Sequence, residues 1–289
     1  MAYWAVAGQL MRTSGLRFIP TMHLELILLL VCTGLFTGFA AGLLGIGGGM
    51  LLVPFFTFIF TIQQFPADHL VHMAIATSLT TILFTSMSSV YAHHRKGSVI
   101  WKAAFMLIPG ILIGAWIGPT LAAMMDTTVL AGFFGIFVTA SALQMLLSKP
   151  PEQAGALPGI PGMFAAGTGI GTLSGLVGAG GGFVTVPFLT WRGVPIHKAV
   201  GTSAVMGFPI ALSGTLSNIY NGWGLPDLPS GSLGYVYLPG LFSVVVSSML
   251  TAPLGARTAH KLNVRQLKRV FAYVLFLLAG YMIWTALKS

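Results

Sequence analysis

Charged residues and cysteine are scarce in this 289-residue chain. Only 7% of its residues are charged, whereas a typical soluble domain has about 25%. The single cysteine, Cys32, excludes an internal disulfide. Because 55% of the residues are hydrophobic, too little polar surface remains to cover a globule in water. This composition excludes a soluble enzyme and a disordered chain, and the bilayer must be the solvent for most of the protein.

Signatures of catalysis are absent as well. The sequence contains no Gly-x-Ser-x-Gly, no His-Glu-x-x-His and no clustered carboxylates. Its histidines, cysteine and acids do not have the spacing of metal ligands. We therefore predict that the protein is not an enzyme and has no cofactor and no metal site. Cys32 lies in an apolar segment, where we expect it to be a small buried hydrophobe.

Basic residues outnumber acids, with 14 Lys and Arg against five Asp and Glu. In a soluble protein this excess would suggest nucleic acid as a partner. Here the basic residues lie in short connectors between apolar runs, which is how a membrane protein fixes its orientation. We expect no nucleic-acid partner; the lipid bilayer is the surrounding that this pattern predicts.

Eight apolar segments are long enough to cross a bilayer. They lie at about 24–44, 70–91, 103–123, 129–148, 162–178, 199–219, 236–254 and 270–287. Two further apolar pieces, about 50–62 and 183–190, are too short to span ~30 Å at 1.5 Å per residue. Each of these directly follows a glycine triplet. This pattern is typical of a broken helix or a re-entrant hairpin.

Both triplets belong to a duplicated motif. The copies read GLLGIGGGMLLVPFF from Gly42 and GLVGAGGGFVTVPFL from Gly175, and nine of their fifteen positions are identical. A second match follows in each half, HMAIATS from His72 and HKAVGTS from His197. Ordered polar matches at nearly equal separations indicate two homologous halves.

The fold class predicted is therefore an all-α polytopic membrane protein of two inverted repeats, each with a glycine-rich helical hairpin plus three further transmembrane helices. Its divisions are 1–23 as an N-terminal extension, 24–148, a connecting loop 149–161, and 162–289. If each hairpin returns the chain to its starting side, eleven of the fourteen Lys and Arg fall on one side. This bias favours inverted repeats with both termini outside.

The triplets are candidate anion-binding elements. They comprise Gly47, Gly48, Gly49, Gly180, Gly181 and Gly182. At the start of a short helix, consecutive glycines expose backbone N–H donors at the positive end of the helix dipole. Two such ends from inverted hairpins would form one anion site near the middle of the bilayer. Close helix packing is the alternative, and it is the interpretation we prefer for the glycines that recur every fourth residue, Gly34, Gly38, Gly42, Gly167, Gly171 and Gly175.

The repeated polar segment supplies further candidates. Thr77, Ser78, Thr202 and Ser203 could donate hydroxyl groups to a bound anion. His72 and His197 could carry a proton during transport. Alternatively, the histidines sit at the membrane interface and the hydroxyls bond back to their own helices.

The paired GxxGxGGG…VPF and HxAxxTS motifs resemble the TauE/SafE group of membrane proteins, often called sulfite exporters, over residues 24–287. The resemblance implies a multi-pass transporter of the prokaryotic cytoplasmic (inner) membrane. Its implied cargo is a small anion such as sulfite or a sulfonate-like organic anion.

We predict a transporter that moves such an anion by alternating access around a midplane site. Coupling of this transport to protons is one form that the mechanism could take. A passive anion channel is the alternative, and a membrane-embedded enzyme ranks third. A homodimer is left open.

Overall fold

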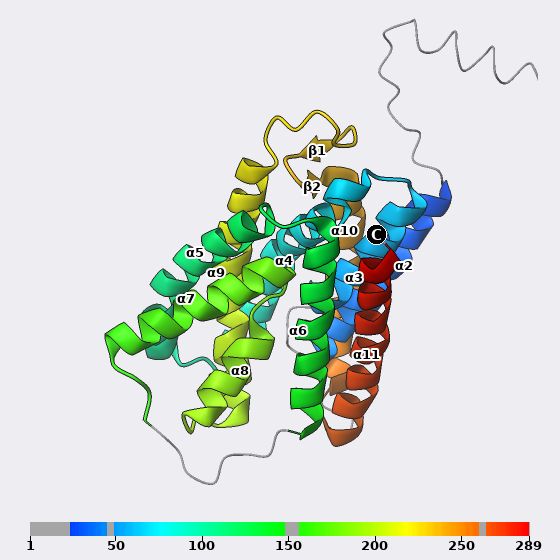
Figure 1. Ribbon diagram of the computed structural model, residues 1–289. Coiled ribbons are helices and arrows are strands. Elements are labelled where there is room, and N and C mark those ends of the chain that lie inside the picture. Colours follow the sequence, from blue (N-terminus) through cyan, green and yellow to red (C-terminus); the bar gives the residue numbers. More distant parts are fainter. Residues whose placement is uncertain (1–23, 45–48, 148–155, 260–263, 289) are drawn as a thin grey trace, which may run out of the picture.

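The computed structural model describes residues 24–44, 49–147, 156–259 and 264–288, and these form helices joined by short connections (Figure 1). The elements in chain order are α2 (Leu24–Leu44), α3 (Gly49–Ile62), the 3₁₀ turn η1 (Ala67–His69), α4 (Leu70–Arg95), α5 (Trp101–Ala122), α6 (Thr127–Leu147), α7 (Ile160–Val177), α8 (Gly182–Trp191), α9 (Ile196–Asn221), β1 (Ser232–Leu233), β2 (Val236–Tyr237), α10 (Leu238–Ala259) and α11 (Val264–Lys288).

Every predicted apolar segment is a helix. Among the described residues, six helices are long and apolar enough to cross a membrane. The two predicted short pieces are confirmed, since α3 has 14 residues and α8 has 10. The all-α membrane class is therefore confirmed. The sequence interpretation missed the small antiparallel hairpin of β1 and β2, in which Ser232 pairs with Tyr237.

Glycines bring α5 and α7 into backbone contact. A Cβ atom on Gly171 would lie 2.5 Å from the Ile111 carbonyl oxygen and 2.8 Å from the Ala115 nitrogen. On the facing helix, a Cβ atom on Gly118 would lie 2.5 Å from the Thr172 carbonyl oxygen. Both helices therefore need small residues every fourth position.

The same device joins α2 to α10. A Cβ atom on Gly34 would lie 2.8 Å from the Val244 carbonyl oxygen, and one on Gly38 would meet the backbone of Ser248. The packing interpretation is confirmed for Gly34 and Gly38, and likewise for Gly167, Gly171 and Gly175. The surroundings of Gly42 lie outside the described residues.

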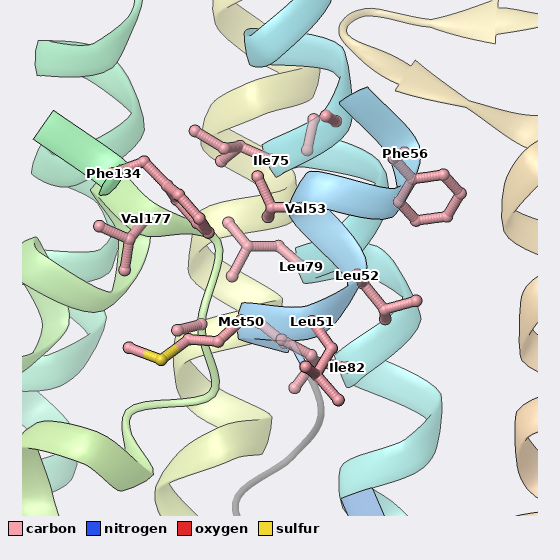
Figure 2. Packing of buried hydrophobic residues seen from close by; sticks show 14 of the residues in the cluster. Met50, Leu51, Leu52, Val53, Phe56, Ile75, Leu79, Ile82, Phe134 and Val177 are labelled. Carbon is pink, nitrogen blue, oxygen red and sulfur yellow. The ribbon is translucent and has the colours of Figure 1, made fainter. Parts of the chain in front are cut away.

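Helices α4 and α9 form the centre of the molecule, and α3 packs against α4. Figure 2 shows Val53 of α3 beside Ile75 and Leu79 of α4. All three side chains are buried in the main hydrophobic cluster. The first half of the molecule therefore has a closely packed apolar interior along α3.

Large apolar side chains also cover the outside. Phe105, Ile136 and Leu277 are 64%, 67% and 72% exposed, as suits a surface covered by lipid. Cys32 is exposed on this surface, so the expectation that it would be buried was wrong. In a bilayer an apolar segment has two apolar surroundings, protein and lipid, so composition alone does not decide which of its residues are buried.

The molecule has two chemically different ends. We call the end that carries the β1–β2 hairpin the hairpin end. There Thr127 donates to the Asp68 carbonyl at 2.7 Å, and Tyr235 of the hairpin stacks on His72. The other we call the basic end, because the link after α4 with Arg95 lies there. His72 and Arg95 are about 35 Å apart along α4, at 1.5 Å per residue.

We call each pair of helices that contains a glycine motif a glycine unit, namely α2 with α3 and α7 with α8. Each glycine unit begins and ends at the same end of the molecule. At the basic end, Leu157 before α7 and Leu189 of α8 share a cluster with Ile100. At the hairpin end, Phe65, just after α3, contacts the ring of Tyr237 at 5.0 Å between centroids. The start of α10 lies at this end too, and α2 runs along α10 in the same direction.

Candidate functional site

The second glycine motif forms a buried turn between α7 and α8, which we call the α7–α8 turn (Gly178–Gly181). Helix α7 ends at Val177 because Gly178 adopts a left-handed conformation, with φ of 66°. Gly181 is left-handed as well, with φ of 76°, and precedes the first residue of α8. Side chains disfavour both conformations, so the turn requires glycine at these two positions.

The start of α3 touches this turn. A Cβ atom on Gly49 would lie 2.5 Å from the Gly178 carbonyl oxygen and 3.1 Å from the Ala179 Cα. A Cβ atom on Gly178 would in turn lie 2.9 Å from a methyl carbon of Val53. The two glycine motifs, 133 positions apart in the sequence, therefore meet backbone to backbone. Gly47 and Gly48, the other two residues of the first triplet, lie outside the described residues.

Ser78 bridges the two motifs. Its hydroxyl oxygen lies 3.2 Å from the Gly49 carbonyl oxygen and 3.1 Å from that of Gly178. Because carbonyls only accept, the single hydroxyl proton of Ser78 is shared between them. In this conformation the hydroxyl holds the backbone together, and its role as an anion donor stays a prediction.

Thr77 and Thr202 make matching contacts in the two halves. The Thr77 hydroxyl accepts a hydrogen bond from the backbone N–H of Tyr237 at 3.1 Å, just before α10. The Thr202 hydroxyl accepts one from the N–H of Ile100 at 3.0 Å, just before α5. Each threonine thus fixes a connection that belongs to the other half. Ser203, beside Thr202, is 2% exposed.

The two candidate histidines differ in their surroundings. His72 is buried, and its Nε2 atom lies 2.9 Å from the Ala122 carbonyl oxygen, so Nε2 carries a proton and donates. Its Nδ1 atom faces the Thr127 hydroxyl oxygen at 3.5 Å, and that hydroxyl already donates to the Asp68 carbonyl. A second proton on His72 could therefore bond Thr127. His197, by contrast, is exposed.

The β-hairpin encloses His72. Tyr235 stacks on His72 with ring centroids 5.4 Å apart, and His69 lies 5.7 Å from the same tyrosine. Burial raises the pKa of the Tyr235 hydroxyl, which keeps it neutral near pH 7. This contact joins residues about 160 positions apart, and no sequence pattern indicated it.

The start of α8 is a buried helix terminus without a side-chain cap. Residues 174–182 are buried, and no side chain caps the helix at Gly181. Among the described residues, no backbone carbonyl outside the helix accepts from the N–H groups of Gly182 or Phe183. Such donors at the positive end of a helix dipole favour a negatively charged ligand.

Several known proteins have sequences similar to this chain. Residues 30–282 match the family described as Sulfite exporter TauE/SafE. A probable membrane transporter protein of Haemophilus influenzae is 38% identical over 254 residues, which cover 88% of this chain and 96% of that protein. A probable membrane transporter protein of Methanocaldococcus jannaschii is 28% identical, covering 90% and 96%. One of Bacillus subtilis is 27% identical, covering 90% and 98%. No solved structure matches the chain.

Proposed function

Since the chain belongs to the sulfite exporter TauE/SafE family of membrane transporters, we propose that it carries a small anion, namely sulfite or a sulfonate-like organic anion, by alternating access. The observation that carries this proposal is the buried, uncapped start of α8 beside the α7–α8 turn. An anion is the ligand that complements buried N–H groups that have no acceptor among the described residues. The glycine triplets and the hydroxyl pairs are the residues that we propose to line its path. In the conformation described, the Ser78 hydroxyl donates to the Gly49 and Gly178 carbonyls, so Ser78 would support this path as a structural residue and not as an anion ligand.

An inverted repeat supports such a mechanism. We propose that 24–148 and 162–289 are the two repeats. In these repeats α2 corresponds to α7, and α5 corresponds to α10. Helix α2 packs against α10 and α7 packs against α5, so the same contact occurs twice with the halves exchanged. The glycine units also return to opposite ends, as inverted hairpins would. Two such units that meet at Gly49 and Gly178 could rock about one central site.

The charge distribution supports an orientation in the membrane. The basic end carries Arg95, Lys96 and Lys102, together with Arg192 and Lys198. Asp68 and Asp126 lie at the hairpin end. Because positive residues are retained in the cytoplasm, we propose that the basic end faces the cytoplasm of a prokaryotic inner membrane.

Proton coupling, where present, would use His72 in preference to His197. His72 is buried and faces a hydroxyl that can accept an additional hydrogen bond. His69 and the Asp126 carboxylate interact with it electrostatically. A change in the charge of His72 would therefore alter its interactions with both of these residues. His197 is exposed, so water would screen the charge that it gains on protonation.

Uptake into proteoliposomes tests the proposal. Purified protein would be offered sulfite, sulfate, thiosulfate, sulfoacetate, taurine and acetate, with and without an imposed pH gradient. We expect saturable uptake of sulfite or a sulfonate and counterflow driven by internal unlabelled substrate. Uptake that does not saturate and shows no counterflow would identify a passive channel instead. Transport of none of these anions would refute the proposed function.

A further inference from the structure

Two buried hydroxyl groups near the start of α8 have no hydrogen-bond partner. Across the described part of the chain, such orphan atoms are Ser174 Oγ, Thr185 Oγ1, Arg192 Nε and Ser232 Oγ. Ser174 is on the last turn of α7 and is 1% exposed, and Thr185 is on the first turn of α8 and is 0% exposed. Both therefore flank the α7–α8 turn from its two helices.

These hydroxyls converge on one point. The position that a Cβ atom on Gly181 would take lies 3.4 Å from Ser174 Oγ and 3.5 Å from Thr185 Oγ1. Gly181 has no side chain to fill that position, and its φ of 76° disfavours one. The methyl end of Ile210, on α9, covers the same point. The two hydroxyls and the flexible methyl end of Ile210 therefore surround the point that a side chain on Gly181 would occupy.

Other buried hydroxyls in this molecule behave differently. Thr57 in α3 is equally buried, yet its hydroxyl donates to the Val53 carbonyl of its own helix at 2.9 Å. Ser141 in α6 donates to the Phe137 carbonyl at 2.8 Å. This back-bonding is the ordinary way for a serine or threonine to be satisfied inside an apolar helix. Ser174 and Thr185 forgo it, which leaves two donors without an acceptor at the cost of stability.

The unpaired groups around this point can all donate. Besides the two hydroxyls, the N–H groups of Gly182 and Phe183 lack an acceptor among the described residues. A water molecule accepts only two hydrogen bonds, so one water would leave donors unpaired. An oxyanion with three oxygens has enough acceptor sites for all four, and the dipole of α8 favours its charge.

Only the second repeat has these hydroxyls. In the duplicated motif, the position of Thr185 corresponds to Leu52. Ser174 directly precedes the second copy, and its counterpart before the first copy is Ala41. Leu52 is a buried hydrophobic residue on α3. At these two positions the first copy has only apolar side chains, whereas the second copy has two hydroxyl groups.

On the basis of the proposed function, we propose that Ser174 and Thr185, together with the N–H groups of Gly182 and Phe183, form the binding subsite for the oxyanion head group of the substrate. The hydroxyls donate to two of its oxygens and the helix amides to the third. This subsite favours sulfite and sulfonates, with three oxygens, over carboxylates such as acetate, with two. It lies in the second repeat alone, so one anion is bound per chain.

The test compares Ser174→Ala, Thr185→Val and the double variant with the wild type, using sulfite as the probe. Proteoliposome uptake gives KM and kcat, and thermal unfolding in detergent gives the apparent Tm with and without sulfite. Each single variant should raise KM about ten- to a hundredfold, the usual effect of losing a hydrogen bond to a charged group. Thr57→Val and Ser141→Ala are matched controls, whose hydroxyls bond their own helices.

A second readout separates binding from folding. Because the two hydroxyls are unpaired when the site is empty, their removal should keep or raise the apparent Tm without sulfite, while the sulfite-induced rise in Tm is lost. If wild-type protein transports sulfite and the variants retain its KM and its sulfite-induced Tm rise, the subsite is wrong and the proposed function stands. An equal rise in KM for the two controls would also overturn the subsite. If the wild type neither transports nor is stabilised by any anion of the panel, the proposed function itself fails.

Discussion

Ser78→Ala should destabilise the protein and leave substrate affinity nearly unchanged. The Ser78 hydroxyl is 0% exposed and bonds the carbonyls of Gly49 and Gly178. No backbone N–H among the described residues outside the helices donates to Gly178, so alanine would leave this buried carbonyl without a donor in the described part of the chain. A buried polar group that loses its partner costs about 1–3 kcal/mol.

That free energy is large enough to measure. At roughly 2–4 °C per kcal/mol, the apparent Tm in detergent should fall by roughly 2–12 °C. Ser141→Ala is the control, because its hydroxyl bonds back to the Phe137 carbonyl at 2.8 Å and alanine suits a helix interior. The KM for sulfite, measured on equal amounts of folded protein, should change less than threefold in both variants.

The opposite result would refute this reasoning. If Ser78→Ala kept its Tm and raised KM by about ten- to a hundredfold, the hydroxyl would donate to the anion. The contact with Gly49 and Gly178 would then belong only to a conformation without substrate. That outcome would return Ser78 to the set of anion ligands that the duplicated sequence motif predicts.

Three other predictions follow from the packing, the histidines and the charge distribution. Gly171→Ala should cost about 1–3 kcal/mol of stability through its contact with the backbone of α5, whereas Gly169→Ala, with nothing within 4 Å, should be neutral or stabilising in the same unfolding assay. His72→Gln should remove the effect of an imposed pH gradient on uptake and His197→Gln should not; equal loss in both would contradict the assignment to the buried histidine. In a Cys32→Ser background, cysteines at Ser98 and Thr258 should resist an impermeant thiol reagent applied to intact cells, and strong labelling of either from outside would contradict the orientation.

Much of the fold could be predicted because a bilayer makes strong demands on sequence. A chain that crosses lipid must satisfy its backbone within helices, so apolar length alone located the long helices and the two short ones. The fourfold spacing of Gly167, Gly171 and Gly175 predicted close helix packing, and their contacts with α5 confirm it. Which helix would be the partner was not readable, because α5 and α7 come from different halves.

The candidate site was predictable only in part. Matched positions in the two copies indicate the glycines and the Thr-Ser pairs, because both copies keep the residues that shape a turn. Ser174 and Thr185 are not matched, since their counterparts are Ala41 and Leu52. A difference between two copies is a signal, but a single sequence gives no physical reason to prefer it to the other mismatches.

The sequence by itself determined the solvent, the helices, the duplication and the glycine spacing for close helix packing, since each depends on local length, composition or spacing. Only the tertiary structure decided which polar groups are satisfied. Thr57 and Thr185 are both threonines in short apolar helices, yet one donates to its own helix and the other has no partner. Cys32 likewise faces outward although its segment is apolar throughout. The physical reason is that hydrogen bonding and burial depend on neighbours from distant parts of the chain, here the α7–α8 turn and the face of α9 that lies over it.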